Sequence, residues 1–164
     1  MDTLEAIRKR CSTRKFNGQP VPKKDLETLV DAGRQAPSAR AVYDWEFIAA
    51  TDKKALAELG KTCDNGRFLK DAGAAILVLY RDGKYYLEDG CAATENILLA
   101  ATALQIGSCW VAGDKKPYVQ NVLKQFGAPE GFKLVSIIAL GYPMQTASGA
   151  KRRELSEVLH WEKF

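Results

Sequence analysis

Two basic clusters near opposite ends of the chain carry the side chains best suited to chemistry. The first, Arg10-Cys11-Ser12-Thr13-Arg14, places two guanidinium groups and a serine hydroxyl in one short string, and the second is Lys151-Arg152-Arg153. Guanidinium and ammonium groups hold phosphate through charge-assisted hydrogen bonds. We predict that the two clusters close around one phosphate group. The alternative is a pair of solvated surface patches, because short basic runs are common on protein surfaces.

The bulk composition limits what these clusters bind. The chain has 164 residues, 46% of them hydrophobic, which predicts a single globular domain over residues 1–164. Its net charge is only +4, without the long basic stripe that follows a nucleic acid, so we expect no nucleic-acid partner. The N-terminus lacks the pattern of a secretory signal, and no apolar run approaches the roughly 20 residues that cross a membrane. We therefore expect a cytoplasmic protein without membrane contact.

The cysteines and the single histidine give little support for a metal site. Cys11, Cys63, Cys91 and Cys109 are widely spaced without a Cys-x-x-Cys pair, and His160 is the only histidine. Zinc and iron-sulfur sites need such ligands in close groups. We predict that the cysteines are reduced and mostly serve as packing residues, and that the protein holds no metal.

Hydrophobic periodicity predicts helices and strands in alternation around the basic clusters. Helices are expected near residues 2–9, over 22–36, over 53–59 with Asp52 as N-cap and Gly60 as stop, over 85–105, and from an Asp114 N-cap to Gly127; strands are expected at 45–50, 73–80, 107–111 and 134–140. The segment 73–80 is nearly all apolar, so this strand should be central and covered on both faces. The pattern is typical of an α+β fold. The tail, which ends in Trp161 and Phe164, is expected to pack on a neighbouring subunit.

A series of short motifs in this chain resembles the nitroreductase family of flavoproteins. In chain order the motifs are Arg10-x-Ser12-x-Arg14-x-Phe16, Ala36-Pro37-Ser38-Ala39, Trp45-x-Phe47, Asp71-Ala72, Leu104-x-Ile106-Gly107-x-x-Trp110, Gly141-Tyr142-Pro143 and Lys151-Arg152-Arg153. No single motif is specific, but their order and spacing cover nearly the whole chain and match the short members of the family. The resemblance implies a nitroreductase-like fold with a central mixed, mostly antiparallel sheet flanked by helices. It also implies an intertwined homodimer with two active sites at the subunit interface.

The resemblance implies FMN as cofactor and NADH or NADPH as co-substrate. Electrons would reach the flavin as a hydride at N5 and leave to a small oxidised acceptor, such as a nitroaromatic, a quinone, an enone or a flavin. The cofactor carries this chemistry, so no catalytic side chain is expected. The alternative is an FMN-binding storage or sensing module without turnover, which would leave no room for a nicotinamide. The segments that would decide between the two are residues 40–44 and 84–88.

The residues that match the family's FMN contacts come from five parts of the chain. They are Arg10, Cys11, Ser12, Arg14, Pro37, Ser38, Ala39, Asn65, Val111, Ala112, Gly113, Lys151 and Arg153. By resemblance, Arg10 and Ser12 lie on the phosphate or ribityl chain, and Lys151 and Arg153 close on the phosphate from the other end. Arg14 reaches the pyrimidine edge, where a cation stabilises the negative charge of the reduced flavin. Cys11 is expected to be a small filler between these contacts.

Three further groups have backbone or amide roles by resemblance. Residues 37–39 match a loop that the second subunit lays against the flavin, with a plain helix stop as the alternative. The Asn65 amide matches the donor and acceptor pattern of the pyrimidine, although Asn-Gly is also an ordinary turn signal. Residues 111–113 would turn backbone N–H groups toward the flavin N5 and O4. Residues 40–44 depart from the family, because they lack a frequent asparagine and proline, so the substrate face is expected to differ.

Overall fold

The computed structural model describes residues 1–145 and 149–164. Within them the chain forms five α-helices, four β-strands and three short 3-10 helices. In chain order these are α1 (Thr3–Lys9), α2 (Lys23–Arg34), η1 (Ala39–Ala41), β1 (Trp45–Ala50), α3 (Lys53–Thr62), η2 (Arg67–Asp71), β2 (Ala74–Arg81), α4 (Tyr86–Ala103), β3 (Gly107–Ala112), α5 (Val119–Gln125), β4 (Phe132–Gly141) and η3 (Leu155–Glu157). The expected alternation of helices and strands is confirmed.

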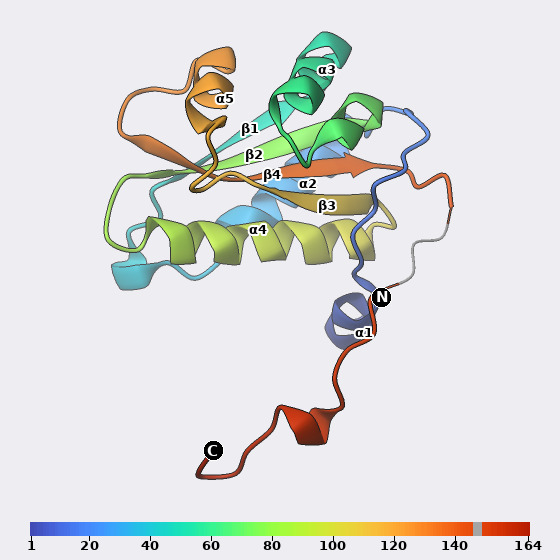
Figure 1. Cartoon of the computed structure of the whole chain (residues 1–164), viewed down its shortest axis with the longest axis vertical. Helices are drawn as coiled ribbons and strands as arrows, with labels where there is room; N and C mark the ends of the chain where they lie inside the picture. The colour runs from blue at the N-terminus through green and yellow to red at the C-terminus, as the bar shows by residue number, and fades with distance from the viewer. Residues whose placement is uncertain (146–148) are drawn as a thin grey trace.

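The four strands form one sheet in the order β1-β2-β4-β3 (Figure 1). All three neighbouring pairs are antiparallel. Among the described residues, the one parallel contact is an isolated bridge between Ser12 and Ser108. Strand β2 lies between β1 and β4, and its residues from Ala74 to Tyr80 are buried. The prediction of a central strand at this apolar segment is therefore confirmed.

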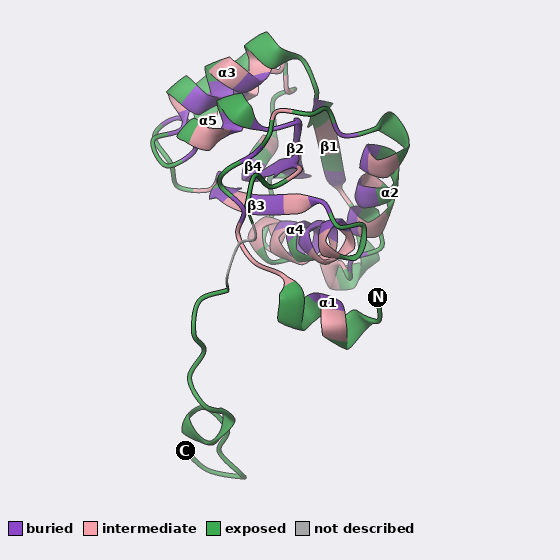
Figure 2. Ribbon diagram, turned by 90° about the vertical axis from the view of Figure 1, so that its right-hand side faces the viewer, coloured by how far each residue is buried: buried purple, intermediate pink, exposed green. Residues whose placement is uncertain are grey.

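Helices cover both faces of the sheet, as Figures 1 and 2 show. Side chains of α2 and α4 share one apolar core with alternate β2 residues such as Ile76 and Val78. Side chains of α3, η2 and α5 share a second core with the intervening β2 residues, such as Leu77 and Leu79. The period of two along β2 thus divides its side chains between the two layers. Burying each of these aliphatic side chains contributes about 1.5–3 kcal/mol.

One helix start is confirmed and one helix stop is wrong. The Asp52 carboxylate accepts a hydrogen bond of 2.9 Å from the Ala55 N–H, as an N-cap does. Gly60, however, does not end α3, which continues to Thr62. A Cβ at Gly60 would lie 3.1 Å from the Arg67 carbonyl oxygen, so the glycine lets η2 pack closely on α3. Gly60 therefore serves helix packing instead of helix termination.

The predicted helix start at Asp114 is also wrong. Helix α5 begins later, at Val119, and its N-cap is Tyr118. The Asp114 carboxylate instead accepts a hydrogen bond from the Tyr86 hydroxyl at the start of α4. Gly127 follows the end of α5 with a φ of +62, a conformation that glycine adopts without strain, so the predicted stop is confirmed. The Asp114 carboxylate is therefore bound by the hydroxyl of Tyr86, which is distant in sequence, and does not cap the helix that the local pattern predicted.

The tail (residues 149–164) extends beyond the body of the chain in Figures 1 and 2 and is exposed throughout. Its large apolar side chains include Leu155, Trp161 and Phe164, and Trp161 is 76% exposed. A single subunit therefore leaves these side chains in water. Among the described helices, none combines the length and the apolar character that crossing a membrane requires.

Candidate functional site

The basic string (residues 10–16) lies along the free edge of β3. The Thr13 N–H donates to the Ser108 carbonyl at 2.8 Å, next to the parallel bridge between Ser12 and Ser108. Strand β3 is at one edge of the sheet, so the string covers the first part of that edge. Extended chains point successive side chains to opposite sides. The string therefore presents two different faces to the protein.

The alternation separates the even-numbered residues of the string from the odd-numbered ones. Cys11 and Thr13 line a cavity beside the end of α4. Arg14 lines a cavity on the other side, and the Ser12 side chain hydrogen-bonds the Cys109 thiol that lines this same cavity. Burial raises the pKa of the Cys109 thiol, and the charges of Arg14 and Arg10 oppose this rise. Ser12 and Arg14 thus lie on the Cys109 side of the string, whereas Cys11 and Thr13 line the cavity on the other side.

The cavity beside Arg14, which we call the β3 cavity, has a volume of about 620 Å³. It brings together four residues that the resemblance assigns to FMN binding: Arg14, Asn65, Val111 and Ala112. It is also lined by Asp64, Arg67, Phe68, Cys109, Trp110, Lys116 and Tyr118, none of which the sequence analysis assigned to the site. Three cations therefore face one carboxylate, so the cavity favours a ligand that carries or gains negative charge.

The strand register shows which backbone groups of β3 point toward the free edge of the sheet. The Ser108 carbonyl points outward to Thr13, whereas the Gly113 N–H points inward and donates to Val135 O at 3.1 Å. Because the N–H and C=O of a strand residue point the same way and alternate along the strand, Trp110 and Ala112 share the outward direction of Ser108. Val111 shares the inward direction of Gly113. Of the three predicted backbone donors, only Ala112 turns its N–H toward the free edge.

Gly113 has a packing role at the end of β3 that the resemblance does not imply, and its place among the FMN contacts stays a prediction. A Cβ at Gly113 would lie 2.7 Å from both the Cγ and the carbonyl oxygen of Leu134. The missing side chain makes room for β4. The cause is a β-bulge at Val135, which has no partner in the register between β2 and β4 and accepts the N–H groups of both Gly113 and Asp114.

Tyr118 lines the β3 cavity and is hydrogen-bonded to the end of β3. Its hydroxyl donates to the Ala112 carbonyl, and the side chain is 7% exposed. Burial raises the pKa of Tyr118 to about 12 from its ordinary value of 10.0. The hydroxyl therefore keeps its proton, and donates, throughout the neutral range. The local sequence pattern does not predict this contact, because the contact joins a turn to the end of a strand through tertiary packing.

Tyr118→Phe is expected to lower the free energy of unfolding by about 1 kcal/mol near neutral pH, because one hydrogen bond is lost. The folded-state pKa lies above the unfolded one, so the stability that Tyr118 contributes is complete below about pH 10 and lost as pH rises toward about 12. The difference between the variant and the wild type should therefore shrink in that window. Urea unfolding at fixed protein concentration measures it; a difference that stays constant up to the top of the window would contradict this assignment.

Arg10 and the late basic residues are less constrained in one subunit. The Arg10 Nε lies 3.9 Å from the Glu95 carboxylate, a weak and half-solvated ion pair. Lys151 and Arg153 are exposed in the tail. The chain that leads to them runs beside the basic string, since the Met144 N–H donates to Lys15 O at 3.0 Å and the Asn17 N–H donates to the Tyr142 carbonyl. Convergence of the two clusters on one phosphate stays a prediction.

The loop predicted to meet a second flavin lies on the opposite layer of the subunit. Ser38 and Ala39 hydrogen-bond Asp89 in the first turn of α4, on the α2 and α4 face of the sheet. The β3 cavity is on the α3 and α5 face, so Pro37, which is exposed, and its two successors do not line the cavity of their own subunit. Residues 39–44 and 80–86 together line a separate cavity of about 230 Å³.

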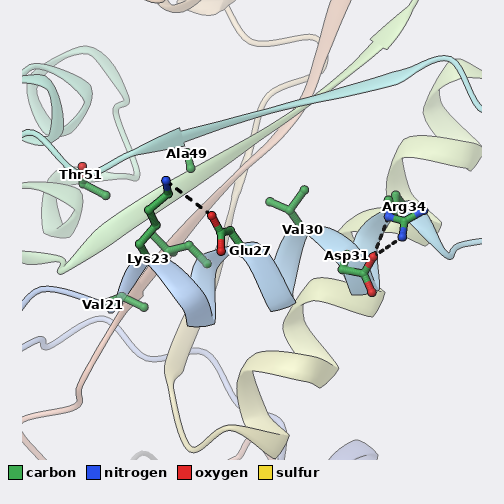
Figure 3. A pocket seen from close by; sticks show the side chains of 9 residues that line it. Val21, Lys23, Glu27, Val30, Asp31, Arg34, Ala49 and Thr51 are labelled. Carbon is green, nitrogen blue, oxygen red and sulfur yellow. Dashed lines mark hydrogen bonds and ion pairs between the residues drawn. The ribbon is translucent and has the colours of Figure 1, made fainter.

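A fourth cavity contains none of the residues implied to bind FMN. It has a volume of about 610 Å³ and lies between α2 and β1, with Val21, Val30 and Ala49 among its lining residues (Figure 3). Its charged side chains pair with one another: Arg34 Nε donates to Asp31 at 2.6 Å, and Lys23 lies 3.6 Å from Glu27. This cavity therefore combines an aliphatic lining with charged side chains that are paired with one another.

Comparison with known proteins identifies the family. The model of the Nitroreductase family matches residues 7–86 and 63–142. The chain belongs to the Nitroreductase family. It is 32% identical over 170 residues to a candidate NADH dehydrogenase/NAD(P)H nitroreductase of Methanothermobacter thermautotrophicus, a match that covers 100% of this chain and 88% of the relative.

Solved structures agree with this assignment. A crystal structure of a candidate NADH dehydrogenase/NAD(P)H nitroreductase from Parabacteroides distasonis has a TM-score of 0.92 and 34% identity, and the match covers 99% of this chain and 98% of that one. A nitroreductase from Bacteroides fragilis with bound FMN has a TM-score of 0.83 and 26% identity, over 99% of this chain and 100% of that one. The nitroreductase-like fold expected from the sequence motifs is confirmed.

Proposed function

We propose that this protein is an FMN-dependent oxidoreductase that passes electrons from NADH or NADPH to a small oxidised acceptor. The observation that carries the proposal is the β3 cavity, which combines the Arg14 guanidinium, the Asn65 amide and the outward N–H of Ala112 around one space. The names of the relatives support it, since one is an NAD(P)H nitroreductase and another holds FMN. Nitroaromatics, quinones, enones and free flavins all remain within the proposed class of acceptor.

The residues present fit FMN by the chemistry of their donors. Arg10 and Ser12 belong to the basic string beside this cavity, and with Lys151 and Arg153 they would hold the phosphate. The Asn65 amide, a donor and an acceptor, suits the pyrimidine edge. Bound FMN would supply the reversible uptake and release of a hydride. Arg14 would stabilise the negative charge that this uptake leaves on the pyrimidine, which raises the reduction potential.

We further propose that the active unit is a homodimer. In one subunit α1 exposes Leu4 and Ile7, at 61% and 51%, and the tail exposes Trp161 and Phe164. Apolar side chains gathered in this way are typical of surfaces that another protein covers. A second copy would cover these side chains. It would also place its own loop around Ser38 next to the β3 cavity of the first subunit, which the first subunit's loop does not line. A cleft between two subunits gives a flavin walls from both sides.

The proposal is tested by purifying the protein, recording its visible spectrum, and adding NADH or NADPH without oxygen. We expect a yellow protein whose flavin absorbance disappears on addition of the nicotinamide and returns when an acceptor is added. A colourless protein that takes up no added FMN would refute the proposal. Bound flavin that neither nicotinamide bleaches would favour storage or sensing of FMN without turnover.

A further inference from the structure

A buried carboxylate ties the loop at residues 38–43, which we call the anchored loop, to α4. The Asp89 side chain is 5% exposed and accepts hydrogen bonds from the Ser38 hydroxyl at 2.6 Å and from the Tyr80 hydroxyl at 2.8 Å. The Ala39 N–H lies 3.1 Å from each of its two oxygens. Three donors from two other segments therefore surround one carboxylate, and all of its contacts serve the loop or the end of β2.

The carboxylate stays ionised in this environment. Burial raises the pKa of Asp89, but the hydrogen bonds from Ser38, Ala39 and Tyr80 outweigh it and hold the pKa below the ordinary value. Asp89 also lies in the first turn of α4, where the helix dipole favours a negative charge. A neutral amide in its place would have a single acceptor oxygen for these donors.

The anchored loop needs such a fastening because its backbone is strained. Arg40, Ala41 and Tyr43 have φ values of 59, 54 and 57, a region that residues with a side chain rarely adopt. The Ser38 hydroxyl oxygen accepts a hydrogen bond of 3.0 Å from the Tyr43 N–H, so the same serine that binds Asp89 also closes the loop. Strained backbone persists where the surrounding contacts over-determine it, and it gathers at functional sites.

We propose that Asp89 is a positioning residue that holds the anchored loop in the shape in which it lies against the flavin of a second subunit. The inference rests on the proposed function for the presence of that flavin. Asp89 itself touches the loop, through Ser38 and Ala39, and acts on the site through it. Tyr80 completes the arrangement, since its hydroxyl lies 3.1 Å from the Ser38 hydroxyl and also donates to Asp89.

Amide hydrogen exchange in the full-length protein tests whether Asp89 holds the loop, independently of flavin. Asp89→Asn is expected to raise the exchange rates of the Ala39 and Tyr43 amides by about tenfold or more, because the hydrogen bonds that protect them are weakened. Glu27→Gln removes the same charge from an exposed position of α2, outside the anchored loop, and should leave both rates unchanged. Equal rates in the Asp89→Asn variant and the wild type would overturn the proposal.

Ser38→Ala provides a second variant in case Asp89→Asn does not fold. It retains the carboxylate but removes the acceptor of the Tyr43 N–H, so it should raise exchange at Tyr43 more than at Ala39, whose N–H still faces Asp89. The double variant should resemble Asp89→Asn alone, because both changes act through one network. Independent, multiplying effects on exchange would count against a shared anchor.

The spectrum and the midpoint potential of the bound flavin test whether the held loop reaches the flavin. We expect Asp89→Asn and Ser38→Ala to shift both, and Glu27→Gln to shift neither. A loop that is released by Asp89→Asn while the spectrum and the potential stay as in the wild type would overturn the positioning role. Failure of the wild-type protein to bind FMN would instead refute the proposed function, and the exchange experiment would still show whether Asp89 fastens the loop.

Discussion

Arg10→Ala and Arg153→Ala are each expected to weaken FMN binding by about 10- to 150-fold, because each removes a charge-assisted hydrogen bond worth about 1.5–3 kcal/mol. The double variant should lose less than the sum of the two single losses, since both guanidinium groups act on one phosphate. Fluorescence titration of the apoprotein with FMN measures all three affinities. Arg8→Ala removes an exposed cation from the same end of the chain and is expected to change the affinity little.

Mixed dimers show whether one subunit supplies both basic clusters. The Met144 N–H donates to Lys15 O, so the segment that follows β4 lies beside the basic string of its own subunit. We therefore expect a dimer of one Arg10→Ala subunit and one Arg153→Ala subunit to contain two weakened sites. A mixed dimer with one site of wild-type affinity would show that Arg153 acts on the partner's phosphate. Additive losses in the double variant would contradict a shared phosphate altogether.

Gly73→Ala is expected to lower the free energy of unfolding by about 3 kcal/mol, a large effect for one methyl group. A Cβ at Gly73 would lie 2.2 Å from the Gln19 carbonyl oxygen and 3.2 Å from the Val21 N, both backbone atoms. The residue cannot retreat, because its N–H donates to Leu140 O at 2.8 Å. The crossing that it permits joins the basic string to α2, so the variant should also weaken FMN binding.

The matched control for this prediction is Gly83→Ala, in the turn before α4. A Cβ at Gly83 meets a single neighbour, the Arg81 carbonyl oxygen at 3.8 Å, which is ordinary contact. Urea unfolding at one protein concentration should give nearly the wild-type midpoint for this variant and a clearly lower one for Gly73→Ala. Equal midpoints for the two variants would contradict the prediction, because they would mean that the backbone at Gln19 moves away from the added methyl group with no loss in the free energy of unfolding.

Most of the secondary structure is predictable from the sequence, because it depends on local patterns. The strand at β2 is a continuous apolar run, and Asp52 is a cap at the start of an amphipathic segment, so both follow from residues that are neighbours in the chain. The roles of Gly60 and Asp114 are not predictable in this way. Each is decided by a contact with another element, η2 for the glycine and Tyr86 for the carboxylate.

The candidate site likewise contains residues that local patterns predict and others that only tertiary contacts decide. Arg14 and Asn65 match family motifs by type and spacing, and the structure places both beside one cavity. The direction of the Gly113 N–H depends on the register of β3 against β4 and on the bulge at Val135, which no local pattern encodes. The role of Asp89 is not predictable from the sequence, because the hydroxyl that it binds belongs to Ser38, 51 residues earlier in the chain. The residue type and its position in a helix do not indicate which distant group it will contact.

The outer edge of β3 is only partly covered by protein. The basic string pairs with it at Ser108 and then turns away, so the N–H groups of Trp110 and Ala112 have no strand beside them. An unpaired edge of this kind is a template on which a foreign chain can add itself as a new strand. In the proposed complex the cofactor would lie in the β3 cavity, which Trp110 and Ala112 of this edge also line. We therefore expect FMN to hinder such pairing when it is bound, and the flavin-free protein to self-associate more readily than the loaded form.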